Sequence, residues 1–147
     1  MEQIYPYVQI VHLICAIIFL GYIFFDIVIF MRLKGTLGAD YERVKKAIGS
    51  RAIKIMPVCL FTLIITGGMM MSRWVGSANG GYFGTPLQKI FMLKVALALI
   101  IAVCVAINLS CRAMGRPAPE FLRANIHKIA FVFGFIIVLC AKLMFVV

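Results

Sequence analysis

A few residues of this 147-residue chain combine a polar side chain that can bind a metal with a position inside a long apolar run. His12, one of only two histidines, lies about one and a half turns into a long apolar run, and Lys94 lies a few residues into another. Polar groups in hydrocarbon are costly, which makes each of them a functional candidate. Because a histidine ring nitrogen is a common metal ligand, His12 is the first candidate for ligation.

Each of these residues also has a plainer interpretation. His12 could serve only as a structural hydrogen-bonding residue, and the Lys94 amine could extend outward to the membrane interface. His127, the second choice as a metal ligand, stands among basic residues near the opposite boundary, which favours an interfacial role. We expect Asp26 to neutralise a nearby base rather than to carry chemistry.

Spacing predicts that several of these residues share helix faces. His12, Phe19 and Asp26 recur every seven residues with Cys15 and Tyr22 between them, which predicts one inward-facing stripe. Small residues in the stripe that begins at His127 would let a helix or a flat ligand approach closely. The three other stripes are Cys59, Thr62, Thr66, Met69 and Arg73; Lys94, Ala98, Ile101, Val105, Asn108 and Arg112; and His127, Ala130, Gly134, Ile137 and Ala141.

The composition identifies the elements that must position these stripes. The chain is 64% hydrophobic, whereas a soluble domain averages about 45–50% apolar residues, so a soluble enzyme or DNA-binding domain is excluded. Four apolar runs, 7–31, 53–72, 90–110 and 126–147, each approach the ~20 residues that cross a bilayer. We expect one all-α domain over residues 1–147, an integral membrane four-helix bundle.

Charge placement predicts the orientation of these spans. Eleven of the 15 basic residues lie in or beside two loops, the one after the first span and the one after the third. The positive-inside rule makes that side cytoplasmic and places both termini in the periplasm. Within the first of these loops, residues 40–54 look like a short amphipathic helix that runs into the second span near Pro57. The outer loop, residues 74–89, is rich in glycine and is expected to be a flexible connection.

Depth predicts which candidates can meet. The first and third spans run in the same direction, so His12 and Lys94 share the outer level, while Asp26 and Asn108 share the inner one. His127 begins the fourth span from the inner side, roughly 20 Å from His12 along the bundle axis. One metal or one haem is therefore not expected to be held by both histidines.

The positions of His12 and Lys94 carry a family resemblance. A histidine early in the first span, a basic stretch before the second and FMLKVALAL at the start of the third resemble the HemJ-type protoporphyrinogen oxidases. The segment RANIHKIAFVF is similar to the opening of that family's fourth helix. The layout also resembles the CopD copper-resistance family, to which HLICAIIFLGYIF looks closer. The chain thus resembles a divergent member of this HemJ/CopD group.

The resemblance implies a haem b protein of the bacterial inner membrane that passes electrons to or from a quinone or a porphyrinogen, an oxidoreductase of the protoporphyrinogen oxidase type. His12 would be one axial ligand, Lys94 the opposite ligand or a partner of a propionate, and Phe19 and Tyr22 further cofactor-binding residues. The alternative is a CopD-like copper protein that uses His12 with Met or Cys ligands. A third possibility is a scaffold subunit that binds only other helices. All three functions are compatible with a homo-oligomer. Nucleic acid is not an expected partner.

Overall fold

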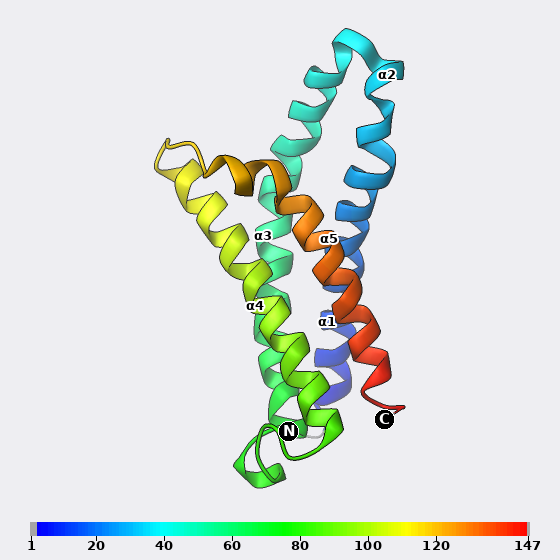
Figure 1. Cartoon of the computed structure of the whole chain (residues 1–147), viewed down its shortest axis with the longest axis vertical. Coiled ribbons are helices and arrows are strands. Elements are labelled where there is room, and N and C mark those ends of the chain that lie inside the picture. Colours follow the sequence, from blue (N-terminus) through cyan, green and yellow to red (C-terminus); the bar gives the residue numbers. More distant parts are fainter. Residues whose placement is uncertain (1–2, 147) are drawn as a thin grey trace. The chain divides into compact units, whose positions relative to one another are not determined.

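The structure, a computed structural model, describes residues 3–146, and within that range every long element is a helix (Figure 1). The only strand-like feature in these residues is an isolated bridge between Gly76 and Gly81. The elements in chain order are α1 (Tyr5–Phe24), a π-helical turn (Phe25–Ile29), a 3-10 turn (Phe30–Leu33), α2 (Lys34–Leu37), a 3-10 turn (Gly38–Asp40), α3 (Tyr41–Trp74), a 3-10 turn (Ser77–Asn79), α4 (Pro86–Ala113) and α5 (Glu120–Leu143).

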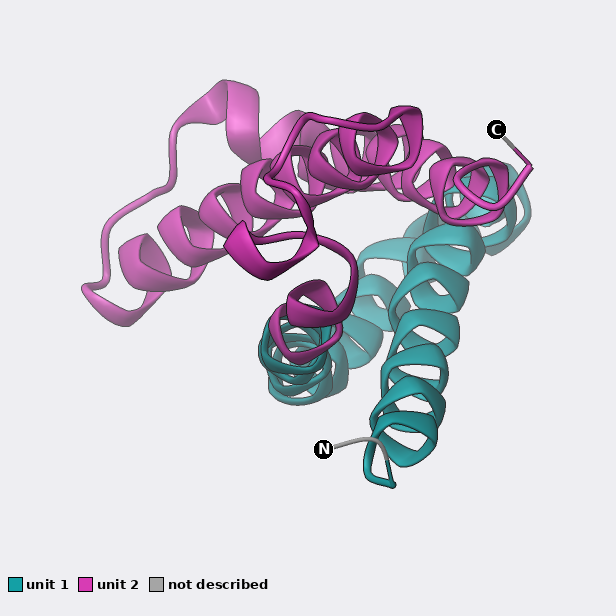
Figure 2. Ribbon diagram, turned by 90° about the horizontal axis from the view of Figure 1, so that it is seen from below, with its two compact units in different colours: residues 1–67 teal, residues 68–147 magenta. Residues whose placement is uncertain are grey.

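The chain divides into two compact units, and the boundary falls inside α3 (Figure 2). Unit 1 ends at Gly67 and contains α1, the short elements between α1 and α3, and most of α3. Unit 2 begins at Gly68 and contains the end of α3, α4 and α5. The two units are described separately below.

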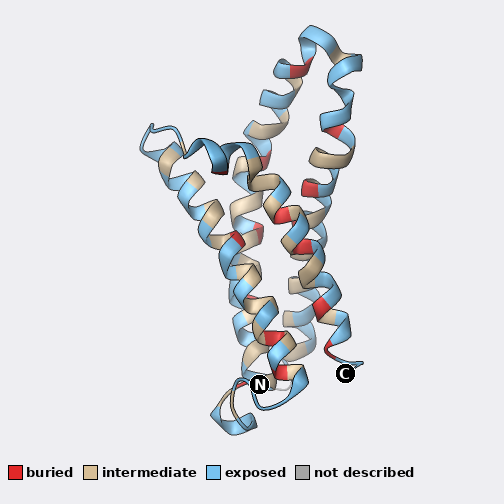
Figure 3. Cartoon of the chain, viewed as in Figure 1, coloured by how far each residue is buried: buried red, intermediate tan, exposed pale blue. Residues whose placement is uncertain are grey.

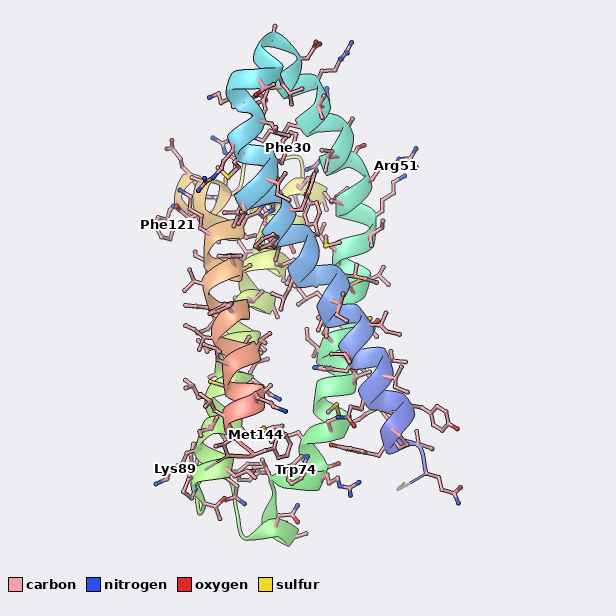
Figure 4. All side chains as sticks on the ribbon, turned by 90° about the vertical axis from the view of Figure 1, so that its right-hand side faces the viewer. Phe30, Arg51, Trp74, Lys89, Phe121 and Met144 are labelled. Carbon is pink, nitrogen blue, oxygen red and sulfur yellow. The ribbon has the colours of Figure 1, made fainter. Side chains whose placement is uncertain are left out.

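Unit 1 is a helical hairpin whose two arms are α1 and α3 (Figure 1). At its turn end, the ring of Phe30 stacks on the ring of Tyr41, with centroids 5.0 Å apart and planes 14° from parallel. Phe30 is 2% exposed and Tyr41 is 6% exposed, and Figure 4 shows Phe30 between the arms. The aromatic pair therefore fixes the closed end of the hairpin.

The basic segment after the first apolar run is part of a longer helix than expected. We anticipated a short amphipathic helix over residues 40–54 that runs into the second span near Pro57, and in the structure the two form one continuous helix, α3, from Tyr41 through Pro57 to Trp74. At 34 residues, α3 is about 51 Å long, which exceeds the ~30 Å hydrocarbon layer. Its basic residues are exposed, and Figure 4 shows Arg51 pointing outward from the helix.

Unit 2 is held together by α4 packed along α5. Ala130 and Gly134, two members of the predicted small-residue stripe, are buried on α5. Such small residues allow two helices to pack closely. Near the end of α5, Met144 packs with Val75 and Phe91 in a buried cluster that Trp74 also contacts. Trp74 and Met144 are labelled in Figure 4.

The outer loop is more ordered than the expected flexible connection. The backbone N–H groups of Gly76 and Gly81 each donate to the carbonyl of the other residue, at 3.1 and 2.9 Å. The Gln88 side chain donates to the Asn79 carbonyl at 2.8 Å and accepts from the Gly84 N–H at 2.9 Å. Gln88 and Thr85 also form a capping box at the start of α4. These hydrogen bonds connect the loop to the helix that follows it.

Among residues 3–146, three helical segments are long and apolar enough to cross a membrane: Tyr5–Trp74, which contains α1 and α3, Pro86–Ala113 and Glu120–Leu143. Most of their large apolar side chains are exposed, as Figure 3 shows along each helix. Such continuous apolar exposure is rare in water and ordinary in lipid. The chain is therefore a multi-pass membrane protein whose apolar helix faces contact the bilayer.

Candidate functional site

The candidate site in unit 1 is built around His12 on α1. Its Nδ1 atom lies 2.8 Å from Oγ1 of Thr66 on α3, a hydrogen bond between residues 54 positions apart in the chain. His12 is half-buried, and Thr66 is 7% exposed. The contact therefore holds the imidazole ring against the neighbouring arm of the hairpin.

Two threonines one turn apart shape the face of α3 that meets His12. The Thr66 hydroxyl donates to the Thr62 carbonyl at 2.6 Å, and the Thr62 hydroxyl donates to the Val58 carbonyl at 2.9 Å. Such bonds to the preceding turn satisfy hydroxyl groups in an apolar helix without water. Cys59, two turns from Thr66 on the predicted stripe, is buried as well.

Gly67 brings the backbone of α3 close to the edge of the ring. A Cβ atom built on Gly67 would lie 3.4 Å from Cε1 and 3.9 Å from Nδ1 of His12. This is ordinary van der Waals contact for one methyl group, and atoms beyond it would enter the space of the ring. The small residue therefore sets how closely the two arms approach at the level of His12.

The other predicted residues of α1 share the face of His12 but lie at other depths. Phe19 is buried, and Tyr22 and Asp26 are half-buried, as expected for an inward stripe. Phe19 and Tyr22 lie about 10 and 15 Å from His12 along the helix axis, because each residue rises ~1.5 Å. Asp26 lies in the π-helical turn Phe25–Ile29, close enough to Tyr22 for an electrostatic interaction.

Lys94 lies in unit 2, where its amine has partners on both α4 and α5. Its Nζ atom is 4.6 Å from the centroid of the buried Phe91 ring, one turn earlier on α4. Cys140 on α5 is near enough to interact with the amine electrostatically. The ammonium group is thus placed over an aromatic face, a recognised environment for a cation in apolar surroundings.

The structure does not test the joint site of His12 and Lys94. His12 belongs to unit 1, whereas Lys94 and the half-buried His127, in the early turns of α5, belong to unit 2. Ligation of one cofactor by His12 and Lys94 therefore stays a prediction, and so does the separation of the two histidines. Within residues 3–146, no group of three or more His, Cys, Asp or Glu side chains is placed to hold a metal ion.

The partner of His12 was missed from the sequence, although its helix face was predicted. Thr62 and Thr66 lie on the stripe expected to face inward, but neither was chosen as a site residue. Their depth in the apolar runs could have paired these residues. His12 lies five residues after the start of the run 7–31, and Thr66 lies six residues before the end of the run 53–72, which is about 8 Å in each case. Two polar residues at one level on adjacent antiparallel spans are natural partners.

Comparison of the chain with protein-family models, with curated proteins and with solved structures finds no match in any of the three.

Proposed function

We propose that the protein binds haem b in the membrane and passes electrons to or from a quinone or a porphyrinogen, with His12 as an axial ligand. The observation that supports the proposal is the position of the His12 ring, half-buried and held across two helices by Thr66. A haem needs only one or two axial side chains, so a cluster of three ligands is not required. An imidazole oriented by a hydrogen bond at one nitrogen fits that need at the other.

The proposed topology has four spans with both termini in the periplasm of a bacterial inner membrane. The segment Tyr5–Trp74 has 70 residues and would be about 105 Å long as one straight helix, far more than one ~30 Å crossing. Its two long helices, α1 and α3, are therefore assigned as separate spans, followed by α4 and α5. The basic residues of the loops after α1 and after α4 then lie on the cytoplasmic side.

Bound haem b would supply one-electron chemistry through its ferric and ferrous states. His12 would hold the haem iron, and the apolar part of the same helix face, which includes the buried Phe19, would keep water away from it. The family resemblance implies that Lys94 would be a second ligand or the partner of a propionate, and in the structure its amine lies over the Phe91 ring. The resemblance to HemJ-type proteins makes a porphyrinogen the first substrate to test.

The proposal is tested with protein purified in detergent from haem-replete cells. A Soret band that shifts on addition of dithionite supports it, and the pyridine haemochrome assay gives the haem-to-protein ratio. We expect His12→Ala to lower this ratio about tenfold or more, equivalent to about 1.4 kcal/mol or more of binding free energy. The matched control is His127→Ala, which removes the other histidine and should leave most of the haem in place.

Two results would contradict parts of the proposal: the first concerns the haem itself, and the second concerns the separate roles of the two histidines. A colourless preparation that contains copper by elemental analysis would favour the CopD-like alternative, in which His12 binds copper with Cys or Met ligands. Equal loss of haem in the two histidine variants would show that His12 and His127 serve the same haem or two haems.

A further inference from the structure

The hydroxyl group of Thr66 has one proton to donate, but two possible acceptors lie beside it: the Thr62 carbonyl oxygen and Nδ1 of His12. Its Oγ1 atom is 2.6 Å from the Thr62 carbonyl oxygen and 2.8 Å from Nδ1 of His12. The Leu63 carbonyl oxygen is farther away, at 3.4 Å. The position of that single proton decides which nitrogen of His12 carries a hydrogen.

The shorter of the two contacts fixes the proton. A carbonyl oxygen has no hydrogen to donate, so two oxygens at 2.6 Å would repel each other unless the hydroxyl proton lay between them. Thr66 must therefore donate to Thr62 and accept from His12. An oxygen atom accepts from Nδ1 only when Nδ1 carries a hydrogen, and this requirement excludes the neutral tautomer whose only N–H is at Nε2.

We infer that Thr66 is a positioning residue that holds His12 in the tautomer with the proton on Nδ1, which makes Nε2 the atom that binds the cofactor. The identity of the ligand atom rests on the proposed function, whereas the tautomer does not. In a neutral imidazole only one ring nitrogen carries a lone pair in the ring plane, and only that nitrogen can bind a metal. A hydrogen bond at the other nitrogen orients the ring for this role.

The surroundings of Thr66 make it suited to this task. Its β-branched side chain has restricted rotation about χ1 in a helix, and its hydroxyl group is anchored on the backbone of the preceding turn. Thr66 is buried, so water does not compete well for the same oxygen. Because the anchor is a backbone carbonyl, the direction of the hydrogen bond depends on the helix itself and not on a second mobile side chain.

The tautomer is measured directly in the protein without haem, from cells depleted of haem. Nitrogen-15 spectra distinguish protonated from unprotonated imidazole nitrogens, and His127→Gln leaves His12 as the only histidine in the chain. At about pH 9, well above the ordinary histidine pKa of ~6.5, we expect a protonated Nδ1 and an unprotonated Nε2. A protonated Nε2 overturns the inference.

Three variants at the two threonines separate positioning from general structure. Thr66→Val keeps the shape but removes the oxygen, and we expect the single tautomer to become a mixture. Thr66→Ser restores the oxygen and should restore the tautomer. The matched control, Thr62→Val, removes a hydroxyl group one turn away but keeps the carbonyl to which Thr66 donates, so it should leave the tautomer unchanged. An unchanged tautomer in Thr66→Val would overturn the assigned role.

The haem-loaded protein provides a second readout that separates the two proposals. We expect Thr66→Val to weaken haem binding about 10- to 100-fold, as for other groups that orient a ligating histidine, and to shift the iron–histidine stretching frequency. If the wild-type tautomer is as inferred but no haem binds, the proposed function fails and the positioning role of Thr66 stands. If haem binds and the tautomer is the other one, the role of Thr66 fails alone.

Discussion

At His12, the two interpretations that the sequence left open turn out to be compatible. A ligand and a structural hydrogen-bonding residue were alternatives only as long as the ring was treated as a single polar group. The hydrogen bond to Thr66 uses Nδ1, and ligation would use Nε2. The sequence predicted that His12 and Thr66 lie on inward faces, but not that they touch, because hydropathy does not specify the register and crossing of two helices.

The space beside the His12 ring provides a steric prediction. Gly67→Ala places one methyl group in ordinary contact with Cε1 and should keep the haem-to-protein ratio near the wild-type value. Gly67→Leu adds atoms beyond that point, which must displace the ring, and should lower the ratio about tenfold, a cost of about 1.4 kcal/mol.

The neighbouring glycine provides a matched control for this steric effect. Among the described residues, no heavy atom lies within 4 Å of a Cβ built on Gly68, and Gly68 is exposed. Gly68→Leu should therefore leave haem content unchanged. Equal losses in Gly67→Leu and Gly68→Leu would show that the helix, and not the ring of His12, is sensitive to the added side chain.

Among the elements, the long apolar helices were easier to predict than their boundaries and connections. Hydropathy identified each apolar run. It could not show that α3 starts at Tyr41, because Tyr41 belongs to the basic segment and is covered by the ring of Phe30, a contact that hydropathy does not reveal. The outer loop carried a readable signal in Thr85-Pro86-Leu87-Gln88, a capping box with proline at the first helical position. Its glycine content was instead interpreted as flexibility.

The order of that loop predicts a local effect of Gln88→Ala. The Gln88 side chain, 3% exposed, joins Asn79, Gly84 and Thr85 through hydrogen bonds of its amide group. Each is worth about 1 kcal/mol, so we expect amide hydrogens of residues 76–88 to exchange about tenfold faster or more. Hydrogen-exchange mass spectrometry measures this change, and Lys89→Ala, an exposed neighbour, is the control. Equal exchange in wild type and Gln88→Ala would show that the loop is not held by this side chain.

Across the whole molecule, many large apolar side chains are exposed, as expected for helices in lipid, and the predicted stripes are mostly buried or half-buried. The predicted stripes correspond to the buried and half-buried positions of the helices, including Phe19, Thr66, Ile101 and Gly134. Met69 and Arg73, at the C-terminal end of one stripe, and Arg112, at the C-terminal end of another, are exposed instead. Periodicity thus identified the packed faces, whereas it could not show where packing ends near a helix terminus.

The basic residues provide a prediction for the topology of the whole chain. Eleven of 15 lie in or beside the loops that follow α1 and α4, and moving such loops outward is strongly disfavoured during insertion. With four spans, both termini must then lie in the periplasm. Alkaline phosphatase, which folds only in an oxidising compartment, should be active when fused after Val147 and inactive when fused after Gly115.

Fusions of GFP at the same two positions test the opposite compartment. They should fluoresce after Gly115 and stay dark after Val147, because GFP exported unfolded to the periplasm does not mature. Three spans in place of four would put the two termini on opposite sides of the membrane, since each crossing reverses the direction of the chain. Labelling of a Gln3→Cys variant with a membrane-impermeant maleimide on intact cells separates these cases: labelling at residue 3 together with phosphatase activity after Val147 requires an even number of spans, and only one of these two signals requires an odd number.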